Sequence, residues 1–280
     1  MLDLLWDALL DSLKMLPFLF GAYLLMEWAE HHTGGRLARA LSRPGVMGEV
    51  GGVVGGALLG IVPQCGFSVA AANLFAARLI SPAVLAAVFL ATSDEAIPVL
   101  LAHPDSLHML WPLLGMKVLL AVLGGLLTAL LFRRARPAED PHADMCAHCG
   151  CEEHGIVRGA LHHTVRIFLL LLAVNLALGV TLHFAGEDAL ATLMLSGSTA
   201  QPFVTALVGL IPNCAASVVL TELFVQGGIS FGSAVAGLCT GAGLGLVVLF
   251  RTNRPMKQNL LLVAWLYAFS VLADVIINMF

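Results

Sequence analysis

The sequence predicts an all-α polytopic membrane protein made of two inverted halves with five hydrophobic segments each. Three observations lead to this fold class. The 280 residues are 59% hydrophobic and 11% charged, and the mean hydropathy is +0.92, which is more apolar surface than a soluble domain of this length buries. A short polar motif occurs twice, 149 residues apart. The lysines and arginines also gather on one side of the topology that these segments imply.

The repeated motif is a turn of proline, a polar residue and cysteine. Residues 61–68 read IVPQCGFS, and residues 210–217 read LIPNCAAS. The register continues past the motif, because Phe75 matches Phe224 and the Ile80-Ser81 pair matches Ile229-Ser230. We therefore expect a first repeat at 1–135, a hydrophilic loop at 136–160 and a second repeat at 161–280.

The hydrophobic segments follow one another in the same order in both halves. Asp3, Asp7 and Asp11 recur every four residues, so the N-terminal stretch is expected to be an amphipathic helix and not a signal peptide. The segments of the first half are 13–28, 46–62, 66–77, 82–101 and 110–132. Those of the second half are 165–184, 199–211, 215–226, 231–250 and 260–280.

An odd number of segments makes the second half enter the membrane upside down, which is typical of secondary transporters. Threaded in this way, 12 of the 14 lysines and arginines fall on one side, and the exceptions are Lys14 and Lys117. The opposite loops carry Asp105, Glu187 and Asp188. The basic side is therefore expected to be cytoplasmic, with both termini outside and the chain in a bacterial-type inner membrane.

Four of the ten segments are shorter than the roughly 20 residues that a membrane-spanning helix needs. They are 46–62 with 66–77, and 199–211 with 215–226. Each pair either crosses the bilayer twice or forms a re-entrant hairpin that turns at the Pro-polar-Cys motif near the midplane. The sequence favours hairpins, because non-helical backbone at membrane depth occurs only where protein buries it or where it lines a wet cavity.

The two tips carry the side chains of a predicted substrate site. Cys65 and Cys214 each open a helix, where the N-terminal N–H groups favour an ionised thiol. Sulfur beside an amide oxygen suits a soft cation or a trivalent metalloid better than a hard cation. The predicted substrate-binding residues are Gln64, Cys65, Ser68, Asn213, Cys214 and Ser217. The alternative is that these cysteines are packing residues, which is the role expected for Cys239.

Two adjacent acids interrupt the fourth segment and predict a coupling site for protons or another cation. Asp94 and Glu95 lie in an apolar stretch and precede Pro98, whereas their counterparts at 242–244 carry no charge. Intramembrane carboxylates are costly unless they face a cavity or a partner. Glu222, two turns after the second tip, is a further coupling candidate. The alternative for Asp94 and Glu95 is a solvated bend at the membrane surface.

The central loop is rich in cysteine and histidine. Its potential ligands are Cys146, His148, Cys149, Cys151 and His154. They suffice for a four-coordinate, zinc-like site, and cytoplasmic thiols stay reduced. The alternative is a solvated linker in which these residues are incidental. No other cofactor and no nucleic-acid partner is expected.

The paired turns, the stretch 92–96, the central loop and the Leu-His-His-Thr run at 161–164 carry a family resemblance. The chain resembles the ten-helix heavy-metal or arsenic efflux proteins, also described as manganese transporters, and is distantly similar to the organoarsenical permeases. The resemblance covers nearly the whole chain. It implies export of a metal or a metalloid.

The expected function is secondary active export of a soft metal or metalloid ion, coupled to protons, and not an enzymatic reaction. The chain lacks the Gly-x-x-x-x-Gly-Lys-Ser/Thr loop of ATP-binding proteins, so a gradient must supply the energy. One alternative is a transporter of a sulfur-containing anion held at the hairpin N-termini. The others are a membrane-embedded thiol oxidoreductase, a lipid-phosphate hydrolase, for which the tips lack basic residues, and a metal sensor that signals through its loop.

Overall fold

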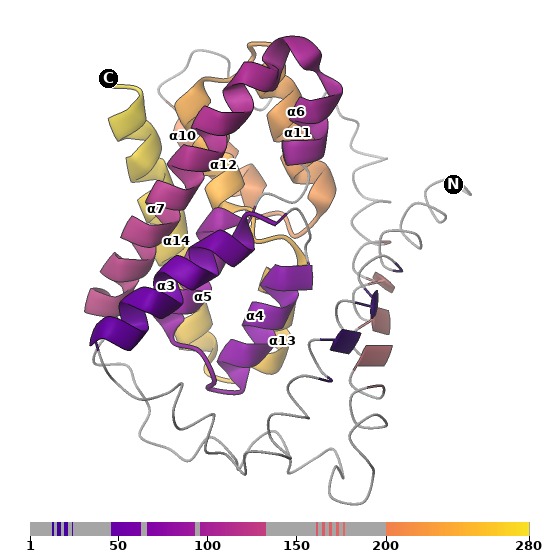
Figure 1. The fold of residues 1–280 in the computed structure, drawn as a ribbon, viewed down its shortest axis with the longest axis vertical. Helices are drawn as coiled ribbons and strands as arrows, with labels where there is room; N and C mark the ends of the chain where they lie inside the picture. The colour runs from indigo at the N-terminus through magenta and orange to yellow at the C-terminus, as the bar shows by residue number, and fades with distance from the viewer. Residues whose placement is uncertain are drawn as a thin grey trace, which may run out of the picture.

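The computed structural model describes residues 46–62, 66–92, 96–132 and 200–279, with isolated helical positions between 13 and 24 and between 161 and 176. Within these ranges every regular element is a helix (Figure 1). The predicted all-α class is confirmed there. The predicted segments 13–28 and 165–184 lie outside the described residues apart from those isolated positions, and so does the central loop.

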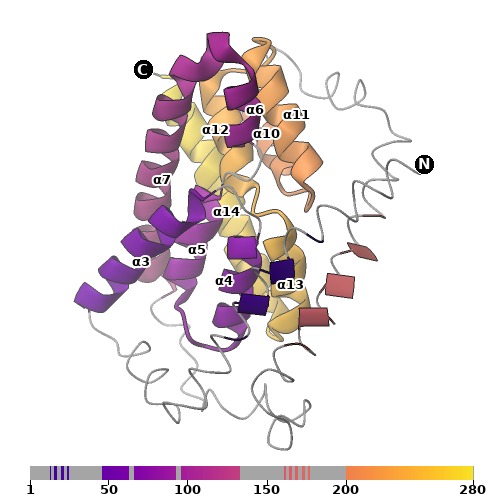
Figure 2. The ribbon, with the colours of Figure 1, turned by 45° about the vertical axis from the view of Figure 1, so that its right-hand side comes forward.

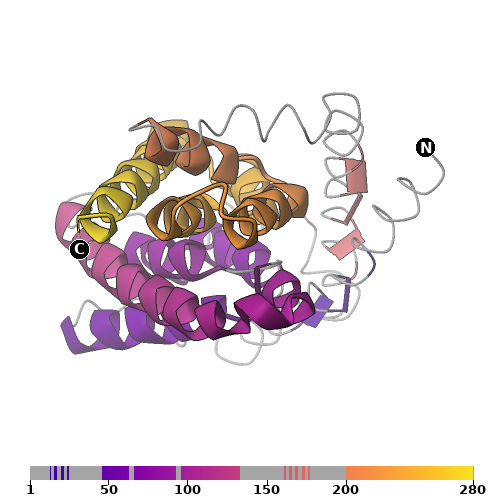
Figure 3. The same cartoon turned by 90° about the horizontal axis from the view of Figure 1, so that it is seen from above.

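The described helices run in the same order in both halves. Those of the first half are α3 (Val46–Gly60), α4 (Gly66–Ala76), α5 (Pro82–Ala91), α6 (Ala96–Ala102), the 3-10 helix η1 (Pro104–Met109) and α7 (Leu110–Leu131). Those of the second half are α10 (Gln201–Gly209), α11 (Cys214–Val225), α12 (Phe231–Thr240), α13 (Leu244–Thr252) and α14 (Met256–Ile277). Viewed from above, the helices of the two halves form two layers (Figure 3).

Among the described residues, four stretches are long and apolar enough to cross a membrane. They are Pro82–Ala102, Pro104–Leu131, Phe231–Thr252 and Met256–Ile277. The first and third are 67% and 83% buried within the molecule, whereas the two others are 39% buried. The two less buried stretches expose rows of leucine, such as Leu119, Leu123 and Leu127 on α7. Such faces fit a lipid environment, so the apolar helices agree with a transmembrane protein.

Two of the membrane-length stretches are broken helices, and they coincide with the predicted segments 82–101 and 231–250. The first stretch pauses between Ala91 and Ala96, and the second between Thr240 and Leu244. In the second break Gly243 has φ 53° and ψ −138°, a backbone conformation that is essentially restricted to glycine. Glycine at this position therefore permits the interruption.

The four short predicted segments coincide with α3, α4, α10 and α11. At about 1.5 Å per residue, the 9 residues of α10 and the 12 of α11 are shorter than the hydrocarbon core of a bilayer. The two open ends of this pair meet, because the Gln201 amide donates to Gly228 O over 3.3 Å and its Oε1 accepts from Ser230 N over 3.3 Å. Helices α10 and α11 thus form a short hairpin.

The turns that follow α4 and α11 have the same hydrogen bonds. Ala77, Arg78 and Leu79 donate their N–H groups to the carbonyls of Asn73, Phe75 and Leu74. Gln226, Gly227 and Gly228, 149 residues later, donate to Glu222, Phe224 and Leu223. Arg78 and Gly227 both have a positive φ, of 60° and 74°. Ser81 and Ser230 then cap α5 and α12 by accepting from Val84 N and Ser233 N.

The helices of the two hairpins pack on the broken helices of the opposite half. Helix α4 lies beside α13 at one end of the molecule, and α11 lies beside α6 at the other end (Figure 2). Within each half, α3 packs on α5 and α10 packs on α12. The turn between α10 and α11 and the break between α12 and α13 lie between these two ends (Figure 2).

Candidate functional site

The second tip is an N-terminal cap built by Asn213. Its backbone is extended, with φ −144° and ψ 141°, and its Oδ1 accepts from Ala215 N over 3.0 Å. Asparagine is among the best residues for this position, because its side chain replaces a hydrogen-bond partner that the first helical turn lacks. Helix α11 therefore begins at Cys214, as the sequence predicted for the second tip.

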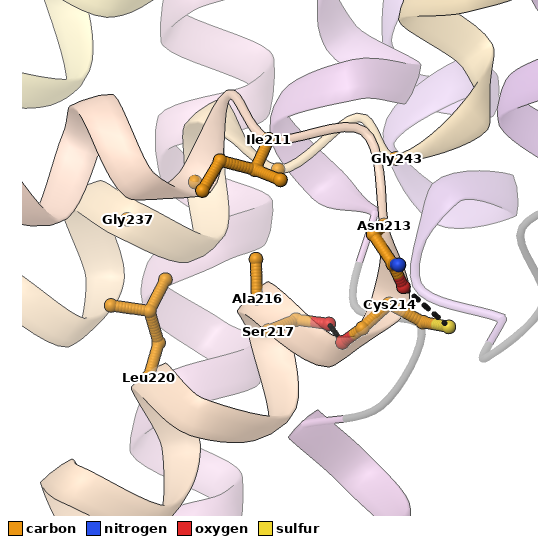
Figure 4. A pocket seen from close by; sticks show the side chains of 10 residues that line it. Ile211, Asn213, Cys214, Ala216, Ser217, Leu220, Gly237 and Gly243 are labelled. Atoms are coloured by element: carbon orange, nitrogen blue, oxygen red, sulfur yellow. Dashed lines mark hydrogen bonds between the residues drawn. The ribbon is translucent and has the colours of Figure 1, made fainter. Parts of the chain in front are cut away.

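Cys214 and Ser217 lie side by side on the first turn of α11. The Cys214 thiol donates to Asn213 Oδ1 over 3.4 Å, and the Ser217 hydroxyl donates to Cys214 O over 2.7 Å. Ile211 and Leu220 lie toward Gly237, whereas the Cys214 sulfur points to the opposite side of the turn (Figure 4). A sulfur and an amide oxygen are thus adjacent, which is the donor pair expected for a soft ion.

A small cavity lies beside this turn. It is lined by Gly209, Ile211, Asn213, Cys214, Ala216, Ser217, Leu220, Gly237, Gly241 and Gly243. Its volume of about 10 Å³ corresponds to the room that one water molecule needs. Gly241 and Gly243 belong to the break between α12 and α13, so the predicted tip and the interrupted backbone share one cavity.

Tight glycine contacts keep the cavity small. A Cβ on Gly209 would overlap the carbonyl oxygen of Gly237. The equivalent residue of the first half, Gly60, has the same kind of contact, because its Cβ would lie 2.7 Å from Val88 O. In each half a glycine, Gly60 or Gly209, therefore contacts the broken helix of that half so closely that only a residue without a side chain fits.

Ser68 is a packing contact between the halves. It is fully buried, and a Cβ on Gly245, near the start of α13, would lie 2.8 Å from the Ser68 Cβ. The structure brings together Asn213, Cys214 and Ser217 at the cavity, but Ser68 does not line it. The remaining predicted site residues of the first tip, Gln64 and Cys65, lie outside the described residues.

Glu222 lies near the end of α11, away from the cavity. Its Oε2 is 3.8 Å from His103 Nε2, and the two side chains are 35% and 40% exposed. His103 also makes a 3.0 Å hydrogen bond between Nδ1 and Val99 O. The other two coupling candidates, Asp94 and Glu95, lie outside the described residues. The same holds for the loop ligands Cys146, His148, Cys149, Cys151 and His154.

Within the part of the chain that the structure describes, no group of three or more His, Cys, Asp or Glu residues is arranged to hold a metal ion. Cys239 is buried in α12, which agrees with its predicted packing role. Among the described cysteines, the tip therefore offers one sulfur, that of Cys214, beside oxygen donors.

Lys117 is a residue that the sequence analysis treated only as an exception in the charge count. It is fully buried in α7, and its ammonium donates to Thr92 O over 2.5 Å and to Leu238 O over 2.7 Å. A lysine inside an apolar segment of 22 residues is a functional candidate by default, because burying its charge in a membrane is costly. That sequence signal was sufficient to single it out.

Comparison of the chain with protein-family models, with curated proteins and with solved structures finds no match.

Proposed function

We propose that this chain is a secondary active transporter that exports a soft metal or metalloid ion across a bacterial-type inner membrane, driven by protons. The observation that carries the proposal is the shared cavity of the Cys214 tip and the broken backbone of α12. In secondary transporters, substrates and coupling ions bind near the bilayer midplane, where discontinuous helices expose unpaired backbone groups. A thiol beside an amide oxygen adds a preference for soft ions.

We further propose that the two halves are inverted repeats. The matched hydrogen bonds, positive-φ residues and serine caps 149 residues apart support this proposal, and so does the reciprocal packing of α4 on α13 and of α11 on α6. Cys65 would then approach the site from the other face, and the two sulfurs would form the ligand pair. Alternating access follows from rocking one half against the other.

The charge distribution supports a cytoplasmic position for one end of the molecule. Arg78 donates to Gln258 Oε1 over 3.5 Å, which joins the α4–α5 turn to the α13–α14 connection carrying Arg251, Arg254 and Lys257. Apart from Lys117, these are the basic residues within the described ranges. Helix α11, which carries Glu222, lies beside α6 at the opposite end (Figure 1). We propose that the basic end faces the cytoplasm.

The test is the content of arsenic, manganese, zinc and copper in cells that express the wild type, Cys65→Ser or Cys214→Ser. We expect the wild type to lower one element selectively and either substitution to restore it, because serine oxygen binds soft ions far less well than thiolate. Cys239→Ser is the matched control, since this buried cysteine lies outside the set of residues that line the cavity. It should lower the element as the wild type does.

An unchanged content of all four elements in wild-type cells would contradict metal export. It would favour a second candidate, transport of a sulfur-containing anion. One observation supports that candidate: the N-terminus of α11 and the buried Lys117 ammonium both place positive charge in the interior. A sulfur-dependent growth defect without any change in metal content would identify it.

A further inference from the structure

The two carbonyls that Lys117 contacts belong to the interrupted ends of α5 and α12. Thr92 is the residue that caps the C-terminus of α5, and Leu238 lies in the last turn of α12. Thr92 comes from the first half and Leu238 from the second, 25 residues before and 121 residues after Lys117 in the chain. One ammonium therefore joins the broken helices of both halves.

Carbonyls at such helix ends need a donor. The last carbonyls of a helix have no intrahelical partner, and they carry the negative end of the helix dipole. At the end of α12 the Ala242 N–H donates to Thr240 O, so it does not satisfy Leu238 O. In a water-poor interior an unsatisfied carbonyl is unfavourable. The Lys117 ammonium removes this cost at both breaks.

The position of the ammonium is the one that a coupling cation occupies in transporters with discontinuous helices, where carbonyls at the helix breaks hold the ion. An ammonium has three N–H donors and a positive charge. A neutral amine keeps two N–H groups but has no charge, so its hydrogen bonds to the two carbonyls are weaker. Lysine, unlike arginine, can lose its proton in a protein interior. Lys117 thus combines the place of a coupling ion with a titratable group.

The Lys117 ammonium contacts Leu238, which is next in sequence to a residue that lines the proposed substrate cavity. Gly237, the residue before Leu238, lines the cavity, and Gly241 and Gly243 follow on the same broken backbone. A cation bound at the Cys214 tip and a positive charge on Lys117 would repel each other across this segment. Binding of one therefore disfavours the other, which is the relation that an exchange of a metal ion for a proton requires.

Within the described residues, few charged or titratable groups lie on the helices that pack against Lys117, and Asp94 and Glu95, which closely follow Thr92 in the sequence, lie outside those residues. Helix α5 carries none, and α12 carries Cys239, which lies within the electrostatic range of Lys117. On α3 and η1 the groups are Glu49, in the first turn of α3, and the exposed Asp105 and His108. On α14 they are the exposed Lys257, Tyr267, which donates to Phe203 O, and Asp274, which bonds to Ser233 and Asn278.

We propose that Lys117 is the proton-coupling residue of the transport cycle. Protonated, it holds the broken ends of α5 and α12 together, as in this structure. When a cation enters the cavity, Lys117 releases one proton to water, its Nζ becomes a neutral amine, and the two halves are free to rearrange. Reprotonation from water on the opposite side, after the cation leaves, restores the contacts. This role rests on the proposed function as an exporter.

The chain has three lysines, at positions 14, 117 and 257, which makes a direct test practical. In the Lys14→Arg, Lys257→Arg variant the remaining lysine is Lys117, and its side-chain ¹⁵N signal can be followed from pH 6 to 10.5 in lipid nanodiscs. We expect the signal to have changed from that of an ammonium to that of an amine before the upper end of this range, where an exposed lysine is still about half charged. A signal that stays that of an ammonium throughout would overturn the coupling role and leave Lys117 as a structural contact.

The second measurement uses transport. Lys117→Arg keeps a permanent charge and hydrogen-bond donors, because arginine does not lose its proton in proteins. We expect this variant to bind the element found in the content experiment at least tenfold more weakly than the wild type, because its permanent charge repels the bound cation, and to export that element at a rate that no longer changes with pH. The matched control, Lys257→Arg, should keep the wild-type pH profile, and an unchanged profile in Lys117→Arg would overturn the proposal.

The two proposals fail separately. A wild type that exports an element while Lys117 stays protonated would refute the coupling role and preserve the exporter. A wild type that changes none of the four elements, with a Lys117 signal that does titrate, would refute metal export and preserve Lys117 as an exchangeable proton site. The ¹⁵N titration does not depend on the identity of the substrate, so it tests Lys117 in either case.

Discussion

Asp274 is the residue at which the two halves differ most clearly in chemistry. Its Oδ2 accepts from the Ser233 hydroxyl over 3.2 Å, and its Oδ1 accepts from the Asn278 amide over 2.6 Å. Its partner on α12 is Gly232, on which a Cβ would overlap Asp274 Oδ1. At the positions 149 residues earlier the glycine is on the other helix: Gly125 corresponds to Asp274, and Ala83 corresponds to Gly232. A Cβ added to Gly125 would lie 3.1 Å from Ala83 O. Each half thus has one glycine in this contact, on α7 in the first half and on α12 in the second.

This reciprocity predicts the effect of Gly232→Ala. The added methyl group would displace the buried Asp274 carboxylate, so we expect the free energy of unfolding to fall by about 1–3 kcal/mol, the usual cost of overpacking. Adding Asp274→Gly to that variant recreates the alanine and glycine pair of the first half and should recover part of the loss. Unfolding in mixed micelles measures all four corners of this double-mutant cycle.

Gly48→Ala is the control for the cycle, because a Cβ at Gly48 meets no atom within 4 Å. If the changes in the free energy of unfolding caused by Gly232→Ala and Asp274→Gly are additive, the smaller side chain at one position does not compensate for the larger one at the other. In that case the reversed pair in the first half has no bearing on the stability of the second.

At the scale of elements, the feature with the greatest consequence is the interruption of two membrane-length helices. Each interruption frees backbone groups that something else must satisfy. The Thr92 hydroxyl donates to Val88 O over 2.8 Å at the end of α5, and the Thr240 hydroxyl donates to Ala206 O over 2.8 Å at the end of α12. With Lys117 between them, the breaks are stabilised by side chains, so they are built features of the fold.

Two glycines of the second break provide a matched pair of substitutions. Gly243 has φ 53° and ψ −138°, so Gly243→Ala should cost about 1–3 kcal/mol of stability and lower transport. Gly241 has φ −74°, and its Cβ would have ordinary contacts at 3.5 Å. Gly241→Ala, although it also lines the cavity, should leave stability within about 0.5 kcal/mol of the wild type.

Thermal unfolding midpoints and transport rates of the two alanine variants measure this difference. Equal losses in both variants would mean that cavity volume, and not the backbone conformation of the break, is what the two glycines protect.

At the scale of the whole molecule, the hairpins decide where the site lies relative to the bilayer. If α10 and α11 turn back at mid-depth, the tip is inaccessible from both bulk phases, whereas two crossings would place it at the cytoplasmic surface. The joined open ends of the pair, Gln201 with Gly228, fit either geometry. Helix length favours the hairpin, because the 9 residues of α10 extend roughly 14 Å at 1.5 Å per residue.

Single cysteines at Gln226, Arg254 and Ile211, in a chain whose six native cysteines are replaced, test this topology. We expect a membrane-impermeant maleimide to label Gln226→Cys in intact cells and Arg254→Cys only after permeabilisation, because the basic end is proposed to be cytoplasmic. Ile211→Cys, at the tip, should react much more slowly than either. Labelling of Ile211→Cys at the rate of Arg254→Cys in permeabilised cells would instead indicate two full crossings.

The sequence by itself determined the local and compositional features of this protein. Apolar segments too long and too numerous for a soluble core predicted helices, and α3, α4, α7 and α11 lie where those segments were placed. The motif repeat predicted a helix opening at Cys214, because asparagine capping acts within three residues of the chain. The paired Ile-Ser positions after each hairpin likewise coincide with the start of α5 and α12.

Tertiary structure alone decided which polar groups meet. The contact of Glu222 with His103, the burial of Ser68 against Gly245 and the two carbonyls held by Lys117 join residues from 25 to 177 positions apart in the sequence. Periodicity and spacing report only neighbours along a helix or a turn. The position of a helix break depends on which distant group satisfies the freed carbonyls, and that partner exists only once both halves have packed together.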